Sequence, residues 1–236
     1  VDDLPRLTVR FRIREGVTWQ DGTPVTADDS VWSAELACDP ETSTDKALCE
    51  RTARYEKVDD RTVEWQGLPG YADPTYYTNF YSPLPRHQLG SDGRRMDEMS
   101  ASEVAADEAL TRRPYAYGPF SVDEWVEGDR IRLERNDGYW RSDEGLPVLE
   151  AVEVRFYDDP DEVLAALLDG DVDVVVRDSL DVVEVEGLEQ AAAEGRVVYR
   201  VLAGTAWEHI DFQLQPADDR IAPGACSEVR RAVALG

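Results

Sequence analysis

The stretch that decides the fold is residues 11–29, which read FRIREGVTWQDGTPVTADD. Its first residues belong to a period of two over 7–14, where apolar and polar side chains alternate as in a strand with one buried face. Residues 20–24 contain an Asp-Gly pair and predict a turn, since this pair favours positive φ. Thr26 is then predicted to cap a helix, and the carboxylates of Asp28 and Asp29 are favourably placed in its first turn.

Strand and helix patterns alternate along the rest of the chain, which predicts an α/β fold with mixed sheets. A further amphipathic helix pattern begins at Glu228 and continues to the last residue, from which we expect a C-terminal truncation. Helices are also predicted at 26–36, 158–170 and 188–193. Strands are predicted at 55–60, 62–65, 131–133, 152–156, 172–176, 197–202 and 210–214.

The charge balance excludes several classes of partner. Fifty acidic residues against 25 basic ones give a formal net charge of -25, so we expect neither nucleic acid nor an anionic membrane surface as a partner. High solubility explains this surface better than an active role for its acids. No apolar run is long enough to cross a bilayer.

The cysteines favour a disulfide over a metal site. Cys38 and Cys49 flank a polar segment, 39–48, that is typical of a loop, whereas Cys226 stands alone. Zinc would require tight cysteine pairs or clustered histidines, and neither occurs. We therefore predict a Cys38–Cys49 disulfide worth about 2–3 kcal/mol of stability, which would place the protein outside the cytosol.

No pattern indicates catalysis, a metal or a cofactor. His87 and His209 lie far apart without a nucleophile motif, and structural roles suit both. Acidic pairs at 158–159 and 171–173 suit capping and solvation better than glycoside hydrolysis. Alternating oxygen side chains over 39–45 resemble a calcium loop, but the required glycine is missing, so a solvated loop is favoured.

Aromatic side chains crowd the proline-rich segment 68–90. Such side chains can wall a cleft that holds a varied ligand by stacking, although filling a core is the commoner role for any one of them. The aromatic residues concerned are Tyr71, Tyr76, Tyr77, Phe80 and Tyr81, with Trp207 elsewhere.

Residues 11–29 resemble the signature of family 5 extracellular solute-binding proteins, the oligopeptide-, dipeptide- and nickel-binding type of ABC importers. Further segments resemble the family's later motifs in the same order. These are Ser82–His87, Tyr117–Phe120 with Glu124–Trp125 and Ile131–Trp140, and Trp207–Phe212 with Val229–Ala232. The chain departs from the pattern at Ala116-Tyr117, where Gly-Thr is usual and positive φ is easier to adopt, and at Gln213, where asparagine is frequent.

The resemblance implies a periplasmic-binding-protein-like α/β fold whose two lobes close on a ligand, in a chain truncated at both ends. It implies a smaller subdomain of the first lobe at 1–113, the main sheet of that lobe at 114–203, and the crossover into a mostly missing second lobe at 204–236. It further implies a monomeric, non-enzymatic, extracytoplasmic protein that captures peptides and delivers them to a membrane permease. Nickel chelates, oligosaccharides, and a sensory or chaperone-like role without import remain alternatives.

The resemblance also bears on the ligand site. In the peptide binders, the charged groups that hold peptide termini come largely from the second lobe, so we expect the principal ligand residues to lie outside this chain. Of the residues present, Trp207 is predicted as a contact near the hinge and Tyr117 as the next candidate. The chain alone is expected to bind ligand weakly, because half of the cleft is missing.

Overall fold

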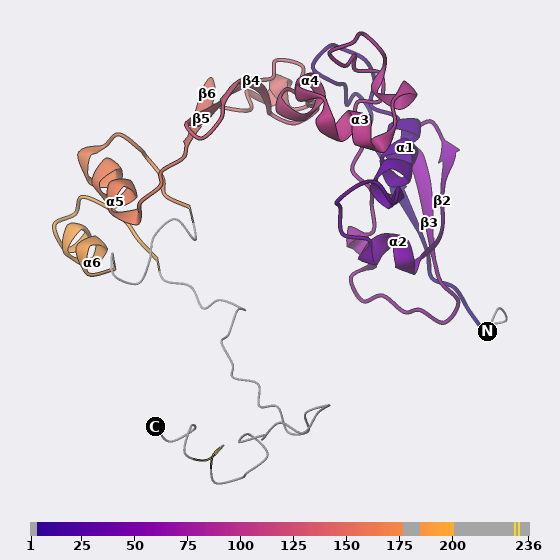
Figure 1. Ribbon diagram of the computed structural model, residues 1–236, viewed down its shortest axis with the longest axis horizontal. Helices are drawn as coiled ribbons and strands as arrows, with labels where there is room; N and C mark the ends of the chain where they lie inside the picture. The colour runs from indigo at the N-terminus through magenta and orange to yellow at the C-terminus, as the bar shows by residue number, and fades with distance from the viewer. Residues whose placement is uncertain (1–3, 177–184, 201–228, 230, 232–236) are drawn as a thin grey trace, which may run out of the picture. The chain divides into compact units, whose positions relative to one another are not determined.

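The computed structural model describes residues 4–176, 185–200, 229 and 231 (Figure 1). The chain divides into two compact units, Val1–Asp158 and Asp159–Gly236. The subdomain limits at 113/114 and 203/204 concern lobes rather than these units, and they stay predictions.

The first sheet is built by the strand patterns at the start of the chain. It contains β1 (Thr8–Arg12), β3 (Thr62–Gly67) and β2 (Thr52–Asp59) in the order β1-β3-β2, with antiparallel pairing throughout. The central strand is the buried one, and Val63 and Trp65 are both fully covered. The strand predicted at 7–14, with its period of two, and the strand pair predicted at 55–60 and 62–65 are thus confirmed.

Helix α1 (Ala27–Cys38) begins where the sequence predicts. The carboxylate of Asp29 accepts hydrogen bonds from the backbone amide of Thr26 at 2.8 Å and from its hydroxyl at 2.9 Å. Arg86 lies 3.4 Å from the same buried carboxylate. The start of the helix is therefore fixed to a segment much later in the sequence.

Short helices complete the first unit beside α1. They are α2 (Ala47–Arg51), η1 (Tyr76–Thr78), η2 (Met96–Glu98), α3 (Ala101–Ala106), α4 (Glu108–Arg112) and η3 (Ser142–Glu144). A small core of Met96, Val104 and Leu110 packs against Trp32 and Leu36 of α1. These apolar contacts join α1 to the polar region that follows the aromatic segment.

A second sheet contains β4 (Phe120–Val126), β5 (Arg130–Arg135) and β6 (Ala151–Arg155) in sequence order. Its pairs are antiparallel, like those of the first sheet, so the described residues include none of the parallel pairing expected of a mixed sheet. The α/β fold class itself is confirmed by the structural neighbours given below.

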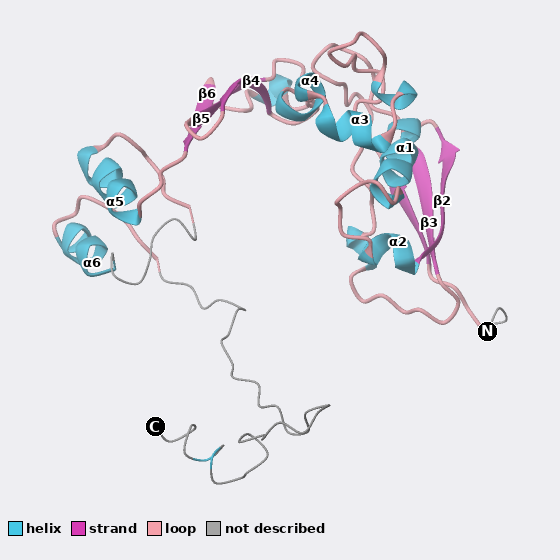
Figure 2. Cartoon of the chain, viewed as in Figure 1, coloured by secondary structure: helices cyan, strands magenta, loops and turns pink. Residues whose placement is uncertain are grey.

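The second unit contains two described helices, which are drawn in cyan in Figure 2. Helix α5 (Pro160–Asp169) is capped by the side chain of Asp159 and ends at Gly170, whose φ is 81°. Helix α6 (Val185–Ala193) is followed by Gly195 at φ 73°. Both helices were predicted, and glycine at each end relieves the steric cost of the left-handed conformation.

Two strand predictions in this unit are wrong over their described residues. Residues 172–176 form no strand, with Val174 77% and Val176 70% exposed, and 197–200 form none either. A strand requires a partner for its amides and carbonyls, and no described residue pairs with these segments. The predicted strand at 210–214 and most of the helix at 228–235 lie outside the described residues.

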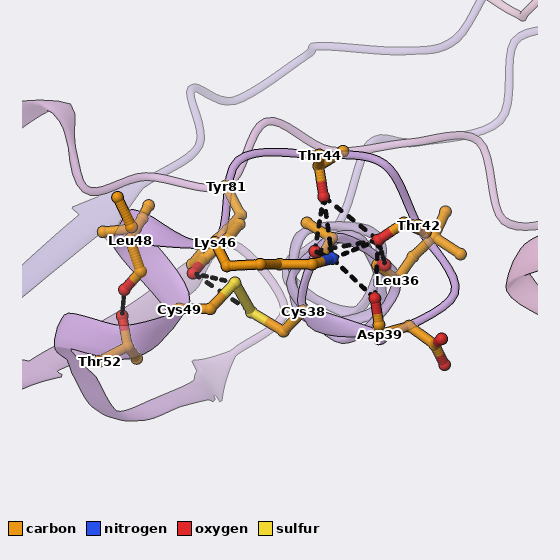
Figure 3. The surroundings of a disulfide bond; sticks show 12 residues. Leu36, Cys38, Asp39, Thr42, Thr44, Lys46, Leu48, Cys49, Thr52 and Tyr81 are labelled. Carbon is orange, nitrogen blue, oxygen red and sulfur yellow. Dashed lines mark hydrogen bonds between the residues drawn. A yellow bond between two sulfur atoms is a disulfide. The ribbon is translucent and has the colours of Figure 1, made fainter. Parts of the chain in front are cut away.

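The predicted disulfide between Cys38 and Cys49 is present, with the two Cα atoms 5.6 Å apart (Figure 3). The hydroxyl of Tyr81 lies 3.5 Å from each sulfur. Since the ring of Tyr81 is buried, the disulfide attaches the loop at 39–48 to the interior of the first unit.

The loop closed by the disulfide contains a lysine, Lys46, whose ammonium group lies among the oxygen atoms of the loop. The ammonium of Lys46 donates hydrogen bonds at 2.6 Å to the carbonyls of Ala37 and Asp39, and it also contacts the hydroxyls of Thr42 and Thr44 (Figure 3). Carbonyls at a helix end lack intrahelical donors, so the ammonium satisfies them. The calcium alternative is thereby disfavoured, since Lys46 occupies the oxygen-lined interior of the loop.

Candidate functional site

The candidate site is an apolar hollow of about 350 Å³ in the first unit, and Tyr117 forms part of its wall. Val25 and Pro83 are buried at its base, while Tyr77 and Trp140 are exposed at its rim. Pockets of this size accept small molecules or parts of larger ones. The full lining is Phe11, Arg12, Ile13, Arg14, Val17, Val25, Tyr77, Phe80, Pro83, Tyr117 and Trp140.

Tyr117 is positioned by the turn that follows the opening strand. Its ring meets the buried ring of Trp19 edge-on, with centroids 5.2 Å apart. Gln20 donates its backbone amide to the carbonyl of Ala116 at 2.8 Å, and its side-chain oxygen accepts the amide of Ala116 at 3.0 Å. The two family-like segments are thus joined directly at this residue.

The segment that departs from Gly-Thr at Ala116-Tyr117 continues into Gly118, which is not among the glycines with positive φ. Asn136 donates its side-chain amide to the carbonyl of Gly118 at 2.9 Å and holds the other side of the segment.

The crowded aromatic segment divides between core and hollow. Tyr81 is buried against Tyr55, with centroids 4.9 Å apart, which is the core role. Phe80 contacts Phe11 at 5.4 Å and faces the hollow, and Tyr77 is 67% exposed at its rim. The core role is therefore observed for Tyr81, whereas Phe80 and Tyr77 line the hollow and their contact with a ligand stays a prediction.

The surroundings of His87 favour a structural role. Its Nε2 is 3.0 Å from Oδ2 of Asp21, and its ring packs near Trp19 and Tyr115. Burial opposes ionisation of Asp21, but hydrogen bonds from the Thr23 amide and from His87 outweigh it and hold the pKa of this carboxyl below its ordinary value. The pair joins the turn at 20–24 to the aromatic segment.

Sequence reasoning missed the two cationic residues of the hollow. The guanidinium carbon of Arg14 lies 4.5 Å from the centroid of the Trp140 ring, in a cation–π contact, and Arg12 lines the same hollow. Their alternation with apolar residues indicates only a strand. The one available clue was that Arg14 and Trp140 both belong to family-like motifs.

Several residues singled out in the sequence lie outside the part of the chain that the structure describes. Trp207, His209, Gln213 and Cys226 lie outside the described residues. Within the described ranges, no group of three or more His, Cys, Asp or Glu side chains could hold a metal ion. None of the described helices has the length and apolar character needed to span a membrane.

Comparison with known proteins identifies the chain's relatives. The oligopeptide-binding protein AppA of Bacillus subtilis is 29% identical over 170 residues, which cover 70% of this chain and 29% of AppA. The solved structure of AppA in complex with a nonapeptide is 27% identical, with a TM-score of 0.59 over 70% of this chain and 31% of AppA.

A second solved structure, of MoaA in complex with mannopinic acid from A. tumefacien R10, is 26% identical with a TM-score of 0.53, over 73% of this chain and 32% of MoaA. The chain spans less than a third of the length of each of these proteins. The family described as bacterial extracellular solute-binding proteins, family 5 Middle, matches residues 4–236. The chain therefore belongs to family 5 of the bacterial extracellular solute-binding proteins.

Proposed function

We propose that this chain is part of the extracytoplasmic substrate-binding component of an ABC importer and that the whole protein captures peptides. The observation that carries this proposal is the similarity to a peptide-bound relative over most of this chain. The open apolar hollow at Tyr117 supports it, because aromatic walls hold side chains of varied shape.

The proposed location is extracytoplasmic, and the proposed partner is a membrane permease. The Cys38–Cys49 disulfide supports this location, since disulfides persist in oxidising compartments. Within the importer, residues 1–113 would form the smaller subdomain of the first lobe, 114–203 its main sheet, and 204–236 the crossover to the second lobe. The binding protein would act as a monomer.

We propose no catalytic role. The family comprises binding proteins, and His87 is engaged by Asp21 and aromatic rings. Of the two residues proposed to contact ligand, Tyr117 has its ring on the hollow, while Trp207 rests on the family resemblance.

A second candidate is a carboxylated small molecule in place of peptides. The neighbour solved with mannopinic acid favours it, because that similarity covers about as much of this chain as the peptide-bound one. The same transport role would then apply to a different solute.

The test is to purify the intact protein without unfolding it, denature it, and identify the released small molecules by mass spectrometry. A ladder of short peptides is the expected result. A single defined compound would replace the substrate and keep the transport role. If the protein is empty, thermal-shift screening with peptides and organic acids follows, and failure of every peptide to stabilise the protein would contradict peptide capture.

A further inference from the structure

We propose that Gln88 is a positioning residue for Tyr117: its buried side-chain amide fixes the segment 113–117 and so sets where the Tyr117 ring lies on the hollow. The inference rests on the proposed function, because Tyr117 is one of the two residues proposed there to contact a captured peptide. Gln88 itself is not among the residues that line the hollow. It is therefore expected to act on binding through Tyr117 alone.

The segment 113–117 connects α4 to β4 without belonging to a helix or a strand, and most of it is half-buried. Backbone amides in such a place need acceptors that a sheet would otherwise supply. The amide of Tyr115 donates to Oε1 of Gln88 at 2.7 Å, and the amide of Ala116 donates to Oε1 of Gln20 at 3.0 Å. Two glutamines from distant parts of the sequence therefore hold the backbone directly before the candidate ligand residue.

The two glutamines differ in how much of the side-chain amide is engaged. Gln88 is 4% exposed, and its Nε2 donates to the carbonyl of Arg113 at 2.9 Å and to that of Ala109 at 3.4 Å, both at the end of α4. Carbonyls at a helix end lack intrahelical donors, so this side chain satisfies them. Gln20 is exposed, and no described residue accepts a hydrogen bond from its Nε2. Gln88 is thus the residue whose whole amide is committed to the segment.

The backbone of Gln88 is itself attached to the interior of the first unit. Its amide donates to the carbonyl of Pro85 at 2.8 Å, and its carbonyl accepts the amide of Met96 at 2.8 Å. Pro85 and Met96 are both buried. A side chain can hold another group in place only where it is held itself, and Gln88 meets this condition.

The position of the segment reaches the hollow through one aromatic ring. Tyr117 lies two residues after Tyr115, and its ring meets the buried ring of Trp19 edge-on at 5.2 Å between centroids while lining the hollow. A backbone displacement at Tyr115 would move this ring against both Trp19 and the hollow. Binding sites lose affinity when their supporting residues leave them about 1 Å too loose.

The experiment replaces the amide of Gln88 in the intact protein. Gln88→Glu keeps an acceptor oxygen but replaces the donor by a second oxygen, which faces the carbonyls of Arg113 and Ala109. Calorimetry with the tripeptide alanyl-phenylalanyl-alanine is expected to show binding about tenfold weaker than that of the wild type. Gln20→Glu should cost less, because the oxygen that accepts the Ala116 amide remains.

Gln66→Glu is the matched control. It adds the same charge to the first unit on β3, away from the segment and the hollow, and should leave binding of the tripeptide unchanged. Thermal unfolding establishes that each variant is folded. Should Gln88→Glu fail to fold, Gln88→Met carries the test, since it removes the same donor without adding a charge.

Two further readouts separate positioning from a general loss of stability. In the Tyr117→Ala background, Gln88→Glu is expected to cause no further loss of affinity, because the ring that it positions is absent. In protein labelled with fluorotryptophan, the fluorine resonance of Trp19, assigned with Trp19→Phe, should shift in Gln88→Glu and in Tyr117→Ala but not in Gln66→Glu.

The proposal is overturned if Gln88→Glu binds the tripeptide like the wild type, if it weakens binding equally with and without the Tyr117 ring, or if the Trp19 resonance stays in place. Failure of peptide capture is a separate result. If the wild type does not bind the tripeptide, the fluorine resonance, which needs no ligand, decides whether Gln88 positions Tyr117.

Discussion

At the scale of single residues, the same type of side chain acquires different roles from its neighbours. Lys46 and Lys57 are the only lysines in the chain. Lys46 satisfies carbonyls at the end of α1, whereas Lys57 is paired at the surface with Asp28 and Asp60, each at 2.8 Å. We expect replacement of Lys46 to cost more stability than replacement of Lys57, because the backbone carbonyls that Lys46 satisfies would lose their donor.

Replacing Lys46 by methionine should therefore lower the free energy of unfolding by about 1–3 kcal/mol, because the carbonyls of Ala37 and Asp39 lose a charged donor. Lys57→Met is the matched control and should cost at most about 1 kcal/mol, as expected for a surface ion pair. Urea denaturation followed by circular dichroism measures both. Equal losses in the two variants would contradict the role assigned to Lys46.

Tyr117 is expected to contribute to ligand binding in the intact protein through its ring in the hollow. Tyr117→Ala should weaken binding of a captured peptide by about tenfold, the loss expected for one partly buried aromatic contact. Tyr76→Ala serves as control, since Tyr76 is 46% exposed and does not line the hollow. Trp207→Ala should also weaken binding, and calorimetry showing unchanged affinity would remove either residue from the site.

A pH dependence is expected at Glu103. Hydrogen bonds from Arg94 and from the Ser100 amide lower the pKa of this carboxyl from 4.5 to about 2. A lowered pKa in the folded state adds stability that is present above 4.5 and is lost as pH falls toward about 2. Glu103→Gln should lessen the loss of thermal stability over this range, while Glu108→Gln should not. Identical pH profiles for wild type and Glu103→Gln would contradict the assignment.

At the scale of elements, the first unit depends on connections between the ends of short helices. The disulfide joins the end of α1 to α2, and the ring of Tyr81 anchors it from the aromatic segment. A helix as short as α2 is marginal in isolation, so this external attachment helps to account for its presence.

Removing the disulfide by the double change of Cys38 and Cys49 to serine should lower the free energy of unfolding by about 2–3 kcal/mol, because the unfolded chain gains freedom over the loop. Chemical denaturation of oxidised and double-serine proteins measures the difference. Intact mass after alkylation without reduction provides the check. Two alkylated thiols at these positions in the unreduced protein would contradict the disulfide.

At the scale of the whole molecule, we expect the chain to carry only part of what ligand binding requires. It spans less than a third of the length of the relatives described above. Closure of two lobes contributes affinity only where both lobes contact the ligand. We expect the hollow at Tyr117 in the first unit to supply only some of those contacts.

The 236-residue chain by itself is accordingly expected to bind peptides weakly or not at all. Calorimetry with short peptides, compared with the intact protein under the same conditions, provides the measurement. Submicromolar binding by this chain alone would show that the principal ligand contacts lie within it.

The sequence by itself determined the elements that depend on neighbouring residues. The strand at 7–14, the helix start at Thr26 and the glycine stops at Gly170 and Gly195 follow from side-chain periodicity, capping and permitted φ, which act over a few positions. The Cys38–Cys49 pairing was predictable for a similar reason, since the two residues flank one short loop.

Only the tertiary structure decided what depends on distant partners. The valine-rich patterns at 172–176 and 197–200 resemble strands, but a strand forms only where another pairs with it. Tyr81 entered the core and Tyr77 the rim of the hollow, although both belong to one aromatic run. The stacking of Arg14 on Trp140 was likewise hidden, because periodicity tells which face a side chain takes and not which distant residue it meets there.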